Sequence, residues 1–173
     1  SLAITNLAAW LGITVTPLEI LKANDFNSTT IIFTGLFLGT LLIVAAIFSR
    51  QRDFKKHFEF TYNNFGMHTL FISCIAAMFH FYNVYLLWFL LLMGIAFYFY
   101  TKALADKSFY ILLISTLYAY FGISFVVINL LTLMNVSGLL PVYIGLMYFI
   151  SSGIGVVLFL IRINKKLKTN DSI

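Results

Sequence analysis

Charged side chains are scarce in this chain of 173 residues. Asp, Glu, Lys and Arg make up 10% of it, whereas 61% of the residues are hydrophobic. A soluble domain carries about 25% charged residues. A water-soluble fold of this composition would have too little polar surface to cover its apolar residues, so the composition excludes a soluble globular protein. Lipid is the solvent in which the composition makes sense.

Cysteine and histidine are also rare. Cys74 stands alone inside an apolar run, and one thiol forms neither an internal disulfide nor a thiolate metal cluster. His68 and His80 fall on one predicted helix, about 18 Å apart along its axis, so they cannot ligate one haem from opposite faces. We therefore predict no cofactor and no catalytic, metal-binding or cofactor-binding residue in this chain.

Long apolar runs are what the chain does have. A spanning helix needs about 20 predominantly apolar residues, and none of the runs has Asp, Glu, Lys or Arg in its interior. The five runs are 30–49, 64–81, 84–101, 108–133 and 139–161. They predict an all-α polytopic bundle of about five transmembrane helices. The absence of internal charge argues against an ion-coupled transporter or proton pump, because these usually bury an ionisable group.

The basic residues support the helix count and orient the chain. All of them except Lys22 lie in the segments 50–63, 102–107 and 162–173, which a five-helix topology places on one side of the membrane. The positive-inside rule makes that side cytoplasmic, with the N-terminus outside and the C-terminus inside. The net charge of +5 is thus a topological signal, and we expect no nucleic-acid partner.

Three regions follow from this topology. Residues 1–29 form an outer N-terminal segment, which could be the tail of a preceding helix; 30–162 form the transmembrane domain; and 163–173 form a basic cytoplasmic tail. Because the sequence starts at Ser1 without a methionine or a signal-peptide pattern, we expect it to be part of a longer polypeptide or to have a processed end.

The first inner loop has an amphipathic helical pattern. Its apolar stripe consists of Phe54, Phe58, Tyr62 and Phe65, and its polar face carries Arg52, Lys55, Lys56 and Glu59. Phe60 sits on the polar face. The pattern predicts a helix that lies in the interface and contacts anionic lipid headgroups. A docking surface for a protein partner is the alternative, and the position of Phe60 favours it.

Small residues spaced four apart suggest where helices pack. Gly35 and Gly39 form one such pair in the first run, and Ser151 and Gly155 form another in the last. Small side chains let helix backbones approach closely in a membrane. The run 108–133 is richest in polar side chains, among which Asn129 stands out, and their default role is hydrogen bonding between helices.

Three stretches carry a resemblance to a family. AWLGITVTPLEILKANDF, HFEFTYNNFG and KSFYILLISTLYAYFGISF resemble a group of uncharacterised bacterial multi-spanning membrane proteins, and the similarity covers most of the chain. Members are usually longer, with more helices. The resemblance implies a bacterial inner membrane; it implies no activity and no functional residue.

Three functions remain open. The first is a membrane scaffold or accessory subunit, with contact surfaces on the inner loop and on the small-residue faces. The second is part of a transporter or carrier for a neutral or lipidic substrate, with 108–133 lining the path. The third is an enzyme acting on lipid-linked substrates, for which the candidates are His57, Glu59 and Asn63.

Overall fold

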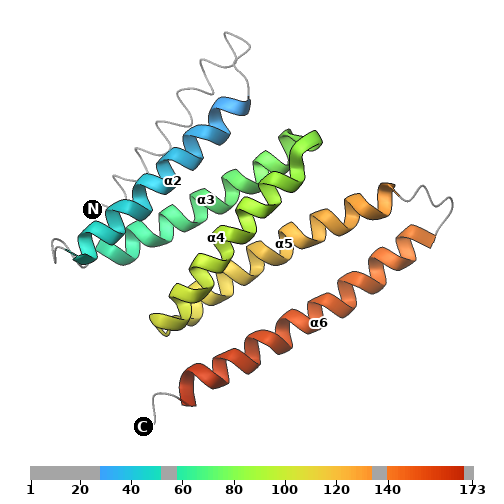
Figure 1. Ribbon diagram of the computed structural model, residues 1–173. Helices are drawn as coiled ribbons and strands as arrows, with labels where there is room; N and C mark the ends of the chain where they lie inside the picture. The colour runs from blue at the N-terminus through green and yellow to red at the C-terminus, as the bar shows by residue number, and fades with distance from the viewer. Residues whose placement is uncertain (1–27, 52–57, 134–139, 170–173) are drawn as a thin grey trace. The chain divides into compact units, whose positions relative to one another are not determined.

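A computed structural model describes residues 28–51, 58–133 and 140–169. Within these residues the chain is helical, without strands, which confirms the predicted all-α class. The helices are α2 (Ser28–Gln51), α3 (Glu59–His80), α4 (Tyr85–Ala105), α5 (Phe109–Leu133) and α6 (Leu140–Thr169), with a short 3₁₀ helix, η2 (Tyr82–Val84), before α4. Figure 1 shows their order along the chain.

Four of these helical segments are long and apolar enough to cross a bilayer: α2, Tyr82–Ala105, α5 and Leu140–Lys165. The chain is therefore a multi-pass membrane protein. The fifth helix, α3, has 22 residues and is about 33 Å long, which is enough to cross the hydrocarbon core. It is more polar than the others, and its buried residues include Asn63, Thr69 and Ser73.

Two helices, α3 and α6, extend furthest beyond the predicted apolar runs. α3 begins at Glu59, so Phe60, Tyr62 and Phe65 belong to its first turns and not to a separate loop. α6 continues past residue 161 to Thr169, into the predicted basic tail. Apolar runs report only the part of a helix that lies in hydrocarbon. An acidic residue at the start of α3 and basic residues at the end of α6 suit the helix dipole and let each helix continue further.

The chain divides into two compact units, Ser1–Trp88 and Phe89–Ile173. In the first unit, α2 and α3 pack side by side as a closely matched pair (Figure 1). In the second unit, α5 contacts α4 where Gly122 lies against Leu92, and α5 contacts α6 more sparsely than α2 contacts α3.

The turn between α4 and α5 is a Schellman motif. The N–H of Ser108 donates to the carbonyl of Ala103 (2.9 Å), and the N–H of Lys107 donates to that of Leu104 (3.4 Å). Lys107 takes the left-handed conformation that closes this motif, with φ of 49°. The Ser108 hydroxyl then accepts the N–H of Ile111 (3.4 Å) and caps α5. This turn sends α5 back toward the opposite membrane face directly after Lys107.

Candidate functional site

Glycines bring α2 and α3 into close contact. Gly35 lies directly against the Ser73 hydroxyl. A Cβ atom added to Gly39 would come within 3.0 Å of the backbone nitrogen of Leu70. One added to Gly66 would come within 2.8 Å of Ile43 Cδ1 and 3.0 Å of the Gly39 carbonyl oxygen. These distances leave no room for a side chain at the crossing, so the backbones themselves are in contact.

Polar contacts join the same two helices at both ends. At one end, the Thr29 hydroxyl and His80 Nε2 are 3.0 Å apart. At the other, Arg50 and Glu59 form an ion pair with an N–O distance of 3.7 Å. Together with the glycine contacts, they advance along α2 as they retreat along α3, so the helices are antiparallel over their whole length. Because α2 is a membrane span, α3 accompanies it across the bilayer.

An aromatic cluster stands at the Thr29–His80 end of the pair. The rings of Phe81 and Trp88 stack with centroids 5.6 Å apart, and Phe33 meets the edge of Trp88 at 6.0 Å. The cluster joins α2, the link after α3 and the first turn of α4. Aromatic rings of this kind gather at membrane interfaces.

Two hydroxyl pairs connect α5 to α6. The Tyr120 and Ser152 oxygens are 3.2 Å apart, as are those of Ser124 and Tyr148. The Ser152 hydroxyl donates its proton to the Tyr148 carbonyl at 2.6 Å, so Tyr120 is the donor to Ser152. Each helix contributes one tyrosine and one serine, which is the interhelical role predicted for the polar residues of α5.

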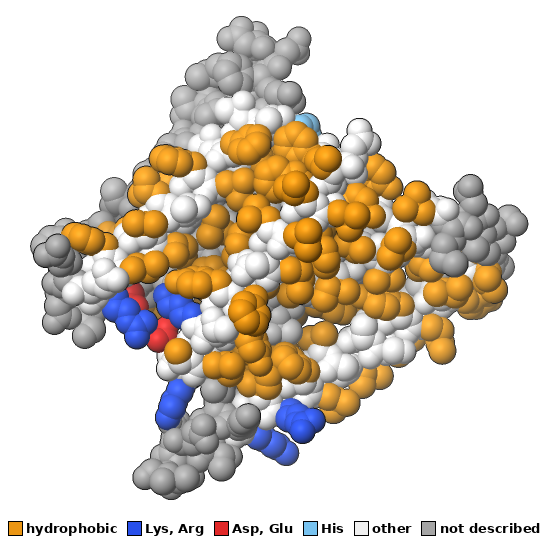
Figure 2. Space-filling model, viewed as in Figure 1, with side chains coloured by type: hydrophobic (Ala, Val, Ile, Leu, Met, Phe, Trp, Pro, Cys, Tyr) orange, Lys and Arg blue, Asp and Glu red, His pale blue; other side chains and the backbone are white. Residues whose placement is uncertain are grey.

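The face of α6 that carries Ser151 and Gly155 is open. No residue of its membrane window is buried, whereas 33% of the α2 window is buried. A Cβ added at Gly153 or Gly155 would meet nothing within 4 Å. Ser151 is exposed, and its hydroxyl donates to the Met147 carbonyl of its own helix at 2.7 Å. Figure 2 shows hydrophobic side chains spread along the described helices, with Lys and Arg side chains at helix ends.

The inner-loop surface is described only in part. Arg52, Phe54, Lys55 and Lys56 lie outside the described residues. Phe60 is the most exposed of the others, at 58%, while Phe58, Tyr62 and Phe65 are half-buried. The rings of Phe58 and Tyr62 are 6.3 Å apart, as expected for neighbours on one helical stripe. Whether this surface binds lipid or protein stays a prediction.

The enzyme candidates are not brought together in a described site. His57 lies outside the described residues, Glu59 pairs with Arg50, and Asn63 is buried in α3. Within the described residues, no group of three or more His, Cys, Asp or Glu side chains could hold a metal ion. Cys74 is buried in the middle of α3.

One polar side chain of α5 is buried without a partner. The Asn129 amide nitrogen has no hydrogen-bond partner within the described part of the chain, and the residue is only 8% exposed. An unpaired buried donor is costly. The sequence singled out Asn129 as polar in an apolar helix, but it could not show that the amide is unpaired.

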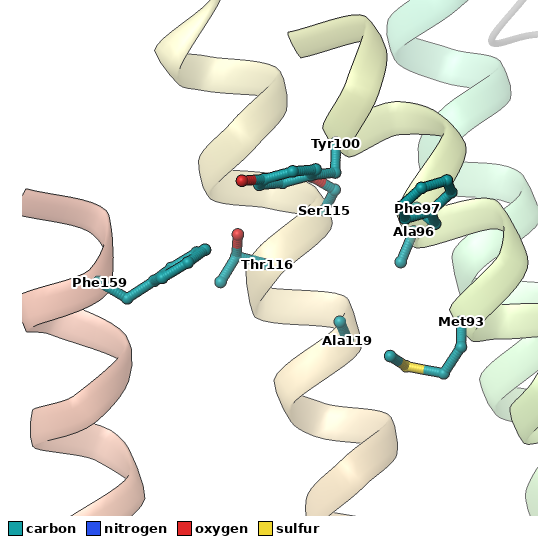
Figure 3. A pocket seen from close by; sticks show the side chains of 8 residues that line it. All are labelled: Met93, Ala96, Phe97, Tyr100, Ser115, Thr116, Ala119 and Phe159. Carbon is teal, nitrogen blue, oxygen red and sulfur yellow. The ribbon is translucent and has the colours of Figure 1, made fainter. Parts of the chain in front are cut away.

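A cavity of about 260 Å³ opens between α4, α5 and α6 of the second unit (Figure 3). Its lining consists of Met93, Ala96, Phe97, Tyr100, Ser115, Thr116, Ala119 and Phe159. Figure 3 shows the Tyr100 and Phe159 rings at one end and Met93 with Ala119 at the other. The sequence analysis missed this site, because its lining residues resemble any other apolar helix face.

No protein-family model, curated protein or solved structure matches the chain.

Proposed function

We propose that this multi-pass chain is a membrane scaffold or accessory subunit, and that α6 docks against a spanning helix of a second polypeptide. The observation that carries the proposal is the open face of α6 around Ser151, Gly153 and Gly155. An apolar helix that is unburied within its own chain faces either lipid or another protein.

The α2–α3 pair supports the proposal that a helix, and not lipid, contacts the open face of α6. In that pair, two small residues four apart, Gly35 and Gly39, receive a neighbouring helix at backbone distance. Ser151 and Gly155 have the same spacing in α6 and open space instead of a neighbour. Small residues gain dispersion contacts only when another backbone approaches them, and lipid tails fill such a surface less well.

The start of α3 offers a second contact surface in this proposal. Phe60 is exposed beside the ion pair of Arg50 and Glu59, at the membrane end where the first inner loop begins. We include the basic inner loop with it, in contact with anionic headgroups on the cytoplasmic side of a bacterial inner membrane. The N-terminus would then lie outside and the C-terminus inside.

Native mass spectrometry of the protein extracted in mild detergent from its source membrane tests the docking. We expect a stoichiometric complex with another polypeptide. The double variant Ser151→Leu with Gly155→Leu should lose the partner, while the matched variant Ser28→Leu with Gly94→Leu should keep it, because Gly94 also meets nothing within 4 Å. Recovery of the wild-type protein as a bare monomer would refute the proposal.

A carrier for a lipidic substrate is the second candidate, and the cavity favours it. The site lies among membrane spans and is lined mainly by apolar side chains. A carrier must release what it binds, so labelled lipid should exchange between vesicles and the purified protein faster than it exchanges between vesicles alone. Equal exchange rates with and without the protein would eliminate this candidate.

A further inference from the structure

We propose that the cavity of the second unit binds one anionic membrane lipid, with an acyl chain between α4, α5 and α6 and the headgroup at their basic end. The inference does not depend on the docking of α6, because most of the cavity lining belongs to α4 and α5. It goes beyond the carrier candidate, since a bound lipid of this kind need not be transported.

The shape of the cavity suits a chain. Met93 and Ala119 line one end of it (Figure 3). Toward the other end the rings of Tyr100 and Phe159 lie nearly parallel, at 24°, with centroids 6.4 Å apart. Met93 and Tyr100 are seven residues apart on α4, which corresponds to about 10 Å of helix rise. The cavity thus follows the helix axis over about two turns, as an acyl chain does.

The two aliphatic hydroxyl groups of the lining, those of Ser115 and Thr116, are already engaged. Ser115 donates to the carbonyl of Ile111 at 2.8 Å, and Thr116 donates to that of Leu112 at 2.8 Å. Their protons are therefore directed at the backbone of α5 and not into the cavity. A polar ligand would lose its hydration there without compensation, whereas a hydrocarbon chain would not.

Positive charge marks the end at which a headgroup would lie. Lys102 follows Tyr100 by two residues on α4, and Arg162 follows Phe159 by three on α6. Arg162 lies about 4.5 Å further along α6 than Phe159 and within about 60° of it around the axis, so it leaves the helix on the cavity side. Lys102 lies about 3 Å further along α4 than Tyr100 but on nearly the opposite face of that helix. Among the residues of the second unit whose side chains the structure describes, Asp106 is the one acidic residue, against Lys102, Lys107, Arg162 and Lys165. This charge balance selects an anionic headgroup.

Fluorescence quenching by brominated lipid tests the site. Phe159→Trp places an indole in the cavity lining, and Phe37→Trp places one on the exposed face of α2, where Phe37 is 70% exposed. The full-length proteins are reconstituted in phosphatidylcholine vesicles that contain a small fraction of lipid with brominated chains, either phosphatidylglycerol or phosphatidylcholine. The wild-type protein corrects for its own two tryptophans.

We expect brominated phosphatidylglycerol to quench the Phe159→Trp indole several-fold more than brominated phosphatidylcholine does, and to quench Phe37→Trp no more than phosphatidylcholine does. Each nearby basic residue favours an anionic lipid roughly fivefold. Changing Arg162→Gln should therefore lower the preference about fivefold. Equal quenching of the Phe159→Trp indole by the two lipids would overturn the proposal.

A filling variant provides an independent readout. Ala119→Leu adds three carbons to the cavity, while Ala105→Leu makes the same change on an exposed part of α4. After extraction in mild detergent, we expect wild-type protein and Ala105→Leu to retain an anionic lipid by native mass spectrometry, and Ala119→Leu to retain much less. Equal retention by both variants would contradict the proposal. If Ala119→Leu does not fold, the quenching result decides alone.

Discussion

The α2–α3 pair and the α5–α6 pair use similar residues in different ways. Both contain small residues four apart, Gly35 with Gly39 and Ser151 with Gly155. In the first pair the glycines are buried against the neighbouring helix, and in the second the small residues face open space. A small-residue motif therefore permits close packing without ensuring it, and the partner's shape decides whether the motif is used.

The two helix pairs also differ in polarity. α3 is too polar to count among the helices that could span a membrane by composition alone. It nevertheless packs beside α2 from Thr29 to Arg50. α6 is apolar and is joined to α5 by two hydroxyl pairs over its first half. In a membrane, a helix with many polar groups needs a protein neighbour along its length, whereas the more apolar face of α6 can meet either lipid or the helix of another protein.

The largest expected effect concerns the glycine crossing. Gly66→Leu should destabilise the protein by about 2 kcal/mol or more, because the new side chain meets Ile43 and the Gly39 carbonyl. Gly153→Leu in α6 should change stability by less than about 0.5 kcal/mol, since nothing lies nearby. Unfolding in micelles titrated with dodecyl sulfate measures both. Equal losses of stability from the two substitutions would contradict the difference in packing between the α2–α3 pair and the α5–α6 pair.

Asn129→Leu should stabilise the second unit by about 1 kcal/mol. The substitution removes a buried amide whose nitrogen has no partner in the described chain, and it keeps the branching and the number of heavy atoms of the side chain. The same unfolding assay measures the gain. A loss of stability would instead mean that Asn129 has a partner in the assembled protein, which would itself support the scaffold proposal.

The hydroxyl pairs between α5 and α6 should contribute less to the free energy of unfolding. A double-mutant cycle between Tyr120→Phe and Ser152→Ala should give a coupling of about 0.6 kcal/mol, the average for hydrogen bonds between membrane helices. The cycle Tyr120→Phe with Ser151→Ala serves as the control, since the Ser151 hydroxyl donates to the Met147 carbonyl of its own helix. A coupling near zero in the first cycle would mean that these hydroxyls do not hold α6.

The smallest effect belongs to the ion pair at the end of α2. Arg50→Gln should cost no more than about 0.5 kcal/mol, because the Arg50 side chain is 55% exposed and the pair is screened by salt. The loss should shrink further in high salt. A larger loss that is independent of salt would show that the α2–α3 pair depends on its end and not on its glycines.

Much of this fold is predictable from the sequence. The five apolar runs gave the five helices, since hydrocarbon length sets the minimum length of a span. Helix ends were less predictable, because Glu59 and Thr169 extend helices into regions where hydropathy carries no signal. The sequence could not show which small pair is packed, because Gly35 and Ser151 differ in their neighbours and not in their own pattern.

The cavity could not be predicted from the sequence for a related reason. Met93, Ala96 and Tyr100 share one face of α4, but every face of that helix is apolar. A cavity arises where neighbouring helices fail to fill the space between them. The sequence of a single helix does not show how its neighbours pack against it. Tyr100 is the one lining residue whose hydroxyl marks a membrane interface, and this signal is common to many tyrosines.

Photo-crosslinking in the source membrane tests the central comparison most directly. A photoreactive residue replaces Ile154 on α6, exposed by 58%, or Phe37 on α2, exposed by 70%. The account predicts a discrete adduct with another polypeptide from position 154 and lipid adducts alone from position 37. Lipid adducts alone from both positions, or a protein adduct from position 37 only, would contradict it.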